Sequence, residues 1–173
     1  THSTRTQSSP VTCPSLPVGR FELEILETAA LGDLLAVSQK MEACRALGLR
    51  FALDDFGTGY ASLAYLKRLP ASIIKIDQSF VIDMLLDAND LAIVEAVIGL
   101  GAAFDTPVIA EGVETIEHGV LLLHLGCNLA QGYGIARPMP AASLPIWANS
   151  WQPDTAFARA TGKILTRQNL PLA

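Results

Sequence analysis

Residues 51–60 read Phe-Ala-Leu-Asp-Asp-Phe-Gly-Thr-Gly-Tyr, an apolar run followed by two aspartates and a glycine-containing segment. The apolar residues Phe51–Leu53 are too few for a helix and are typical of a buried strand. The glycines beyond them give the backbone the freedom that a tight or mobile loop needs. This stretch therefore predicts a buried strand whose far end delivers Asp54 and Asp55 to a loop.

Similar short runs recur along the chain, and each is bounded by residues typical of turns or helix ends. We expect strands at Phe21–Ile25, Phe51–Leu53, Ile73–Ile76, Val108–Ala110 and Leu129–Gly132. Apolar residues at three- and four-residue spacing predict helices between them, at 34–47, 61–68, from the Asn89–Asp90 cap to Thr106–Pro107, and at 116–125. Strand followed by helix, repeated, predicts an α/β fold with parallel strands and right-handed crossovers.

Polar residues gather where the predicted strands end, namely at Glu24, Asp54, Lys75, Glu111 and Gln131. In a (β/α) barrel the carboxyl ends of all strands converge on one mouth, and that is where such enzymes carry out their chemistry. The periodicity alone is compatible with an open sheet as well. The placement of the polar residues favours the barrel.

Composition excludes several classes of function. The formal net charge of −5, with no basic run longer than Lys67–Arg68, argues against a partner that is a nucleic-acid polymer. The apolar stretches are too short to span a bilayer, so we expect no membrane contact from this segment. Cys13, Cys44 and Cys127 are odd in number and lack zinc-site spacing, which fits a reducing cytoplasm.

A carboxylate in or just after an apolar strand is costly to bury unless it is paired or bound to a cation. Taken singly, Glu24 could be a solvated edge residue and Asp54 could cap the following turn. Several carboxylates at the same end of successive strands instead suggest hard oxygen ligands for Mg²⁺ or Mn²⁺. Adjacent Asp54 and Asp55 could reach two cations, and a two-metal site would serve an in-line phosphodiester displacement.

Lys75 is a cation in the otherwise apolar strand Ile73–Ile76 and needs an anionic neighbour. Asp77, two residues further on, or the carboxylates of adjacent strands could supply one. Lys75 could orient an attacking water or steady a phosphate, or it could be a salt-bridged structural residue. From the residues alone, a metal-assisted enzyme that uses Lys75 to abstract a proton also fits.

Five segments resemble, in order and spacing, the successive signatures of the EAL domain family: FELEILET at 21–28, DDFGTGYASL at 54–63, IKIDQSFV at 74–81, VIAEGVET at 108–115 and QGYGIARPMP at 131–140. The resemblance implies a TIM-like barrel that hydrolyses cyclic di-GMP to linear pGpG with Mg²⁺ or Mn²⁺. It therefore implies a phosphodiesterase of bacterial signal transduction, with cyclic di-GMP as its small-molecule partner.

The resemblance also implies roles for individual residues. Glu24 and Asp54 resemble metal ligands, and Asp55 resembles a ligand of the second metal. Lys75 is similar to the residue that helps to hold the nucleophilic water. Glu111 resembles the essential carboxylate that is credited with metal binding or base catalysis.

Further positions match the rim of the family's site. Glu27 resembles the glutamate that anchors the mobile loop after Asp55. Glu114 is a second carboxylate of the motif that contains Glu111, and Arg137 lies in a segment expected to shape the substrate mouth. The remaining matches are the loop residues Gly57, Thr58 and Gly59, and Gln131, which resembles a glutamine near the metals.

The resemblance covers the C-terminal two-thirds of the domain. The family's earlier ligands, the glutamate of Glu-Ala-Leu and an asparagine, have no counterpart here, and Glu95 of Glu95-Ala96-Val97 lies in a predicted helix. We therefore expect an irregular segment at 1–19, a barrel portion at 20–147 that is incomplete at its N-terminus, and a C-terminal extension at 148–173.

Two functions remain open from the sequence alone. The first is a phosphodiesterase that is complete within a larger signalling protein, where an upstream sensor or GGDEF domain would fit. The second is an inactive, truncated module that binds cyclic di-GMP or another protein. Because ligands are missing, we expect the isolated chain to be poorly active or inactive, and an unpaired sheet edge would favour association, a homodimer being one form of it.

Overall fold

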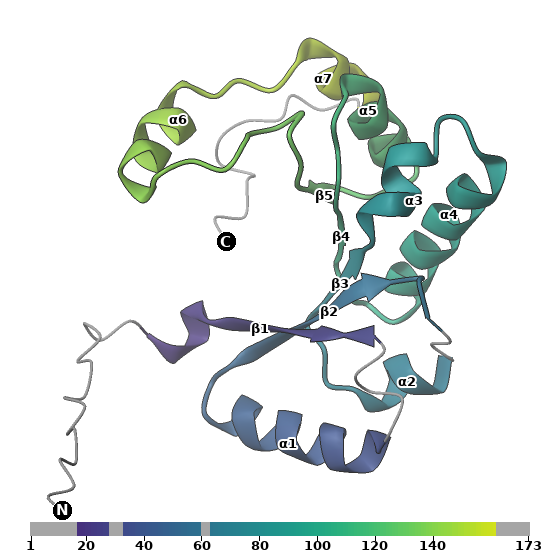
Figure 1. Ribbon diagram of the computed structural model, residues 1–173, viewed down its shortest axis with the longest axis vertical. Coiled ribbons are helices and arrows are strands. Elements are labelled where there is room, and N and C mark those ends of the chain that lie inside the picture. Colours follow the sequence, from purple (N-terminus) through teal and green to yellow (C-terminus); the bar gives the residue numbers. More distant parts are fainter. Residues whose placement is uncertain (1–16, 28–32, 60–62, 162–173) are drawn as a thin grey trace, which may run out of the picture.

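A computed structural model describes residues 17–27, 33–59 and 63–161 of the chain. Five strands form one sheet in chain order, and every neighbouring pair is parallel. They are β1 (Glu22–Leu26), β2 (Arg50–Phe56), β3 (Ile73–Ile76), β4 (Val108–Ala110) and β5 (Leu129–Ala130). The parallel α/β fold expected from the sequence is thereby confirmed (Figure 1).

Helices follow the strands and cover one side of the sheet (Figure 1). The α-helices are α1 (Leu34–Ala46), α2 (Leu63–Arg68), α3 (Gln78–Asp83), α4 (Ala88–Ala103), α5 (Ile116–His124), α6 (Leu144–Ser150) and α7 (Thr155–Thr161). The described residues also include the short 3₁₀ helices η1 (Val18–Arg20) and η3 (Ala141–Ser143). The beginning of the helix expected at 61–68, and most of the irregular segment expected at 1–19, lie outside the described residues.

Side-chain caps fix where the longer helices begin. Asp33 accepts a hydrogen bond from the Ala36 amide at 3.0 Å and starts α1. Asp87 accepts one from the Asn89 amide at 2.7 Å, so α4 begins before the Asn89–Asp90 pair that the sequence predicts as its cap. At the other end of α1, Gly48 adopts a φ of 94° that glycine tolerates without strain.

Three α-helices of the described residues were absent from the sequence-based prediction. Helix α3 is short and starts directly after β3, where the Asp77 carboxylate accepts a hydrogen bond from the Ser79 amide at 2.9 Å. Helices α6 and α7 are each seven residues long and have too few turns for a clear apolar period. Helix α7 packs on α5, and Phe157 lies so close to Gly119 that a β-carbon there would stand 2.7 Å from its ring.

The core lies between the sheet and its helices. It combines strand residues with α4, and its members include Leu53, Ile74, Ile76, Ala110, Val94 and Val97. Strand β3 is buried along its whole length because it is the middle strand of the sheet. Lys75 is therefore a buried cation in a strand whose other residues are all apolar.

The outer strands of the sheet are β1 and β5. Phe21, directly before β1, and Leu23 and Leu26 on β1 are between 42% and 48% exposed, so the β1 side of the sheet presents apolar surface. Within the described ranges, no helix has the length and apolar character required to cross a membrane.

We predict that Gly101→Ala lowers the free energy of unfolding by about 1–3 kcal/mol, because a β-carbon at position 101 would lie 2.2 Å from a methyl carbon of Val108. Gly99→Ala in the same helix meets nothing within 4 Å and should stabilise the protein by about 0.5–1 kcal/mol. Urea denaturation of both variants checks this pair. Equal effects of the two substitutions would contradict the packing of α4 on β4.

Candidate active site

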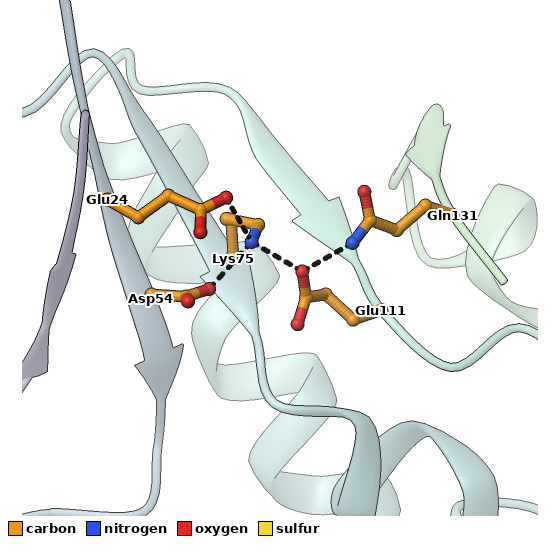
Figure 2. Close-up of polar contacts among 5 residues, drawn as sticks. All are labelled: Glu24, Asp54, Lys75, Glu111 and Gln131. Carbon is orange, nitrogen blue, oxygen red and sulfur yellow. Dashed lines mark hydrogen bonds and ion pairs between the residues drawn. The ribbon is translucent and has the colours of Figure 1, made fainter. Parts of the chain in front are cut away.

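The side-chain ammonium of Lys75 is the centre of an ion-pair network that joins four strands or their ends (Figure 2). Its Nζ atom lies 2.7 Å from Glu24 Oε1, 2.7 Å from Asp54 Oδ1 and 2.6 Å from Glu111 Oε1. Only 8% of the Lys75 side chain is exposed, while Asp54 and Glu111 are also largely covered. Carboxylates from β1, β2 and the end of β4, and not Asp77, therefore neutralise this lysine.

Gln131 extends the network to the end of β5. Its Nε2 atom donates to Glu111 Oε1 at 2.6 Å, so Lys75 and Gln131 hold the same carboxylate oxygen (Figure 2). The backbone near Glu111 is also fixed, because the Val113 amide donates to the Gln131 carbonyl at 3.1 Å. Gly112, with φ at 72°, allows this turn to pass close to the Cβ atom of Gln78.

The adjacent aspartates reach the same place because the end of β2 is irregular. In a regular strand, neighbouring side chains point to opposite faces of the sheet. Asp55 has a φ of 53°, and the register of β2 against β3 shifts between Leu53 and Phe56. As a result, Asp54, Asp55 and Glu111 each offer a carboxylate oxygen within 4.8 Å of the other two.

The acidic cluster of Asp54, Asp55 and Glu111 carries more negative charge than the ammonium of Lys75 balances. Burial raises the pKa of Glu111, and the attraction of Lys75 only partly opposes that increase. Burial, Asp54 and Asp77 raise the pKa of Asp55. Burial acts to lower the pKa of Lys75, but its hydrogen bonds to Asp54, Glu111 and Glu24 outweigh burial and raise it. Lys75 is therefore a permanent cation at neutral pH.

The donor set suits a hard divalent cation. The cluster of Asp54, Asp55 and Glu111 offers carboxylate oxygens alone, which favours ions of the Mg²⁺ and Mn²⁺ type over zinc. Glu24, whose side chain is 55% exposed, contributes a further carboxylate at the same mouth. The unbalanced negative charge gives a cation a second reason to bind there.

Glu27 serves the loop after β2. It is only 4% exposed, and its Oε2 atom accepts hydrogen bonds from the Gly57 amide at 2.9 Å and the Gly59 amide at 3.2 Å. The Thr58 hydroxyl donates to the Asp55 carbonyl at 2.9 Å. The loop that follows Asp55 is thus tied to the end of β1, and Glu27 does not join the carboxylates around Lys75.

Glu114 and Arg137, expected at the substrate mouth, line a cavity that also reaches Glu111 and Gln131. Tyr133 and Trp147 line the same cavity, and neither was among the predicted site residues. Tyr133 lies inside the QGYGIARPMP segment, which also contains Arg137. An aromatic residue and an arginine in one short motif were a signal available in the sequence. Trp147 lies on α6, a helix that the periodicity did not predict.

The sequence matches the profile of the EAL domain family over residues 14–138. The chain therefore belongs to the EAL domain family. Domains of this family have a TIM-barrel-like fold, and the parallel sheet of this chain corresponds to part of it.

Relatives from Pseudomonas aeruginosa are similar to this chain over most of its length. It is 45% identical over 130 residues to the bifunctional diguanylate cyclase/cyclic di-GMP phosphodiesterase MucR of Pseudomonas aeruginosa, a match that covers 75% of this chain and 19% of MucR. It is 39% identical to the cyclic di-GMP phosphodiesterase NbdA of the same species, over 79% of this chain and 17% of NbdA. The chain thus spans less than a fifth of the length of these relatives.

Solved structures agree with the sequence comparison. The structure of the MucR phosphodiesterase in complex with cyclic di-GMP superposes with a TM-score of 0.72 at 45% identity, covering 75% of this chain and 52% of that one. A manganese and cyclic di-GMP complex of Klebsiella pneumoniae BlrP1 gives a TM-score of 0.66 at 33% identity, covering 71% and 31%.

We predict that Asp55→Asn weakens Mn²⁺ binding by at least about tenfold without changing the fold. Asparagine tolerates the positive φ at this position, so the substitution removes the charge and keeps the backbone. Asp105→Asn is a matched control, since Asp105 also has a positive φ of 52° but precedes β4 at the opposite end of the sheet. Calorimetric titration with Mn²⁺ compares the two, and equal affinities would remove Asp55 from the metal site.

Proposed function

We propose that this chain forms the catalytic face of a divalent-metal-dependent phosphodiesterase that hydrolyses cyclic di-GMP to linear pGpG. The observation that carries the proposal is the convergence of Asp54, Asp55 and Glu111 beside Lys75, in a chain of the EAL family. Relatives named as cyclic di-GMP phosphodiesterases support the choice of substrate. Mg²⁺ or Mn²⁺ is the proposed cofactor.

Charge explains why this site would need cations. A phosphodiester is an anion, and it would meet a mouth where Glu24, Asp54, Asp55 and Glu111 surround the ammonium of Lys75. When bound, divalent cations would neutralise the phosphate, polarise it and lower the pKa of a coordinated water. Asp54, Asp55 and Glu111 would hold them, with Glu24 as a further oxygen donor.

Lys75 has a positioning role in this proposal. It fixes Asp54, Glu111 and Glu24 by short ion pairs and keeps these carboxylates at the same mouth despite their mutual repulsion. Its raised pKa keeps it protonated at neutral pH, so it cannot accept a proton there. This argues against the alternative in which Lys75 is the base of a proton-abstraction enzyme.

Glu111 is better suited to a proton transfer. Its pKa is raised by burial, which makes it a stronger base than an ordinary solvated carboxylate. Lys75 and Gln131 both bind its Oε1 atom, which leaves the other carboxylate oxygen, Oε2, for a cation or an attacking water. We infer that Glu111 orients that water and takes up its proton.

The relatives also bear on the biological setting. MucR and NbdA are several times longer than the matched segment, which supports a module of a larger signalling protein. Cyclic di-GMP as the partner, and the bacterial cytoplasm as the location, belong to the same proposal.

We expect Asp54→Asn to lower kcat/KM for cyclic di-GMP by at least about a hundredfold, because ligands misplaced by about 1 Å cost that much in rate. The measurement is pGpG release by the full natural protein with Mg²⁺ or Mn²⁺, with and without EDTA. Glu95→Gln is the control, since Glu95 is an exposed residue within α4. Hydrolysis that persists in EDTA, or in Asp54→Asn, would contradict the metal mechanism.

A further inference from the structure

His118 is a buried residue near the start of α5 that the proposed mechanism does not use. It is only 5% exposed, and its Nδ1 atom accepts a hydrogen bond from the backbone amide of Glu114 at 3.3 Å. An imidazole nitrogen can accept only when it carries no proton, so in this contact the ring proton of a neutral imidazole lies on Nε2. His118 therefore acts as an acceptor toward the segment that precedes its own helix.

Thr115 and His118 together cap the start of α5. The Thr115 hydroxyl oxygen accepts a hydrogen bond from the His118 amide at 3.3 Å, which satisfies one amide of the first helical turn. In a capping box, the side chain three residues after the cap returns a hydrogen bond to the backbone amide of the cap residue. His118 occupies that position but binds the amide one residue earlier, that of Glu114. It thereby ties the helix to the turn before it.

The turn that joins β4 to α5 begins with Glu111 and is held by hydrogen bonds along its length. The Glu111 amide donates to the carbonyl of Ile76 on β3 at 3.3 Å. The Val113 amide donates to the carbonyl of Gln131, directly after β5, at 3.1 Å. Both acceptors are backbone atoms. At the far end of the turn the acceptor is a side chain, that of His118, so a substitution can remove this hydrogen bond alone.

Helix α7 fixes the backbone that carries the imidazole. It packs on α5, where the ring of Phe157 lies against Gly119. A β-carbon at Gly119 would lie 2.7 Å from that ring, so only glycine allows the two helices to approach this closely. Gly119 directly follows His118 in the chain. The histidine is therefore presented to the turn from a closely packed part of the fold.

We propose that His118 is a positioning residue for Glu111. By holding the Glu114 amide, it fixes the far end of the turn and keeps the Glu111 carboxylate in place beside Lys75. This inference rests on the proposed function, in which Glu111 orients the attacking water and takes up its proton. Residues that orient a metal ligand without touching the metal typically change metal affinity or activity by about 10- to 100-fold when they are replaced.

Two substitutions separate the acceptor from the bulk of the ring. Asparagine can place its side-chain oxygen where Nδ1 lies, whereas leucine fills similar space without an acceptor. At saturating Mn²⁺ and cyclic di-GMP, we expect His118→Leu to lower kcat of the full natural protein by about 10- to 100-fold, and His118→Asn to keep kcat within about threefold of wild type. His124→Leu is the matched control, because His124 is an exposed histidine at the last residue of α5 and should leave kcat unchanged.

A double substitution tests whether His118 acts through Glu111. In a Glu111→Gln background, His118→Leu should lower kcat by much less than it does in wild type, because the group that it positions is already changed. Equal losses in both backgrounds would contradict this route. An unchanged kcat in His118→Leu, or the same loss in His118→Asn, would overturn the positioning role.

Hydrogen exchange resolved to the Glu114 amide tests the contact independently of activity. We expect this amide to be protected in wild-type protein and in His118→Asn, and to exchange at least about tenfold faster in His118→Leu. An unprotected Glu114 amide in wild-type protein overturns the proposal even where His118→Leu does not fold. Wild-type protein that protects this amide but does not hydrolyse cyclic di-GMP would instead contradict the proposed function itself.

Discussion

The position of the Lys75 ammonium is the constraint on which the site depends. It lies on the central strand of the sheet and forms short ion pairs with Glu24, Asp54 and Glu111, which come from strands on both sides. Like charges at this spacing repel one another, so the carboxylates would separate without a cation between them. Parallel pairing supplies the geometry, because it brings the same end of every strand to one edge of the sheet.

Much of this arrangement could be predicted from the sequence. Apolar runs ending in Asp54 and Glu111 identified both the strands and the edge at which the side chains meet, because a strand and helix that repeat along the chain make the strands parallel. The positive φ of Asp55 could not be predicted, since it depends on how β2 shifts its register against β3. The contact of Glu27 with Gly57 was likewise beyond periodicity, because it joins residues 30 positions apart. Only the family resemblance had suggested it.

Two glycines of the segment after β5, Gly132 and Gly134, show how the site and the fold share constraints. A β-carbon at Gly132 would lie 2.3 Å from the Val113 amide nitrogen, and one at Gly134 would lie 2.7 Å from the Glu114 carbonyl oxygen. The segment after β5 therefore passes directly over the turn that follows Glu111. Because Glu114 and Gln131 belong to these two segments, close backbone packing sets the spacing between the acidic cluster and the cavity. Spacing of this kind is invisible to any pattern within a single element.

The sequence left two roles open for Lys75, a structural salt bridge or a group that serves the reaction. The geometry makes these roles inseparable, because the carboxylates that neutralise Lys75 are the proposed ligands Asp54 and Glu111. A buried ion pair rarely adds net stability against an apolar alternative, whereas loss of one partner is costly. Lys75 is thus poorly explained as a stabilising device alone. Its burial is better accounted for by the need to hold several carboxylates together at a mouth where cations are proposed to bind.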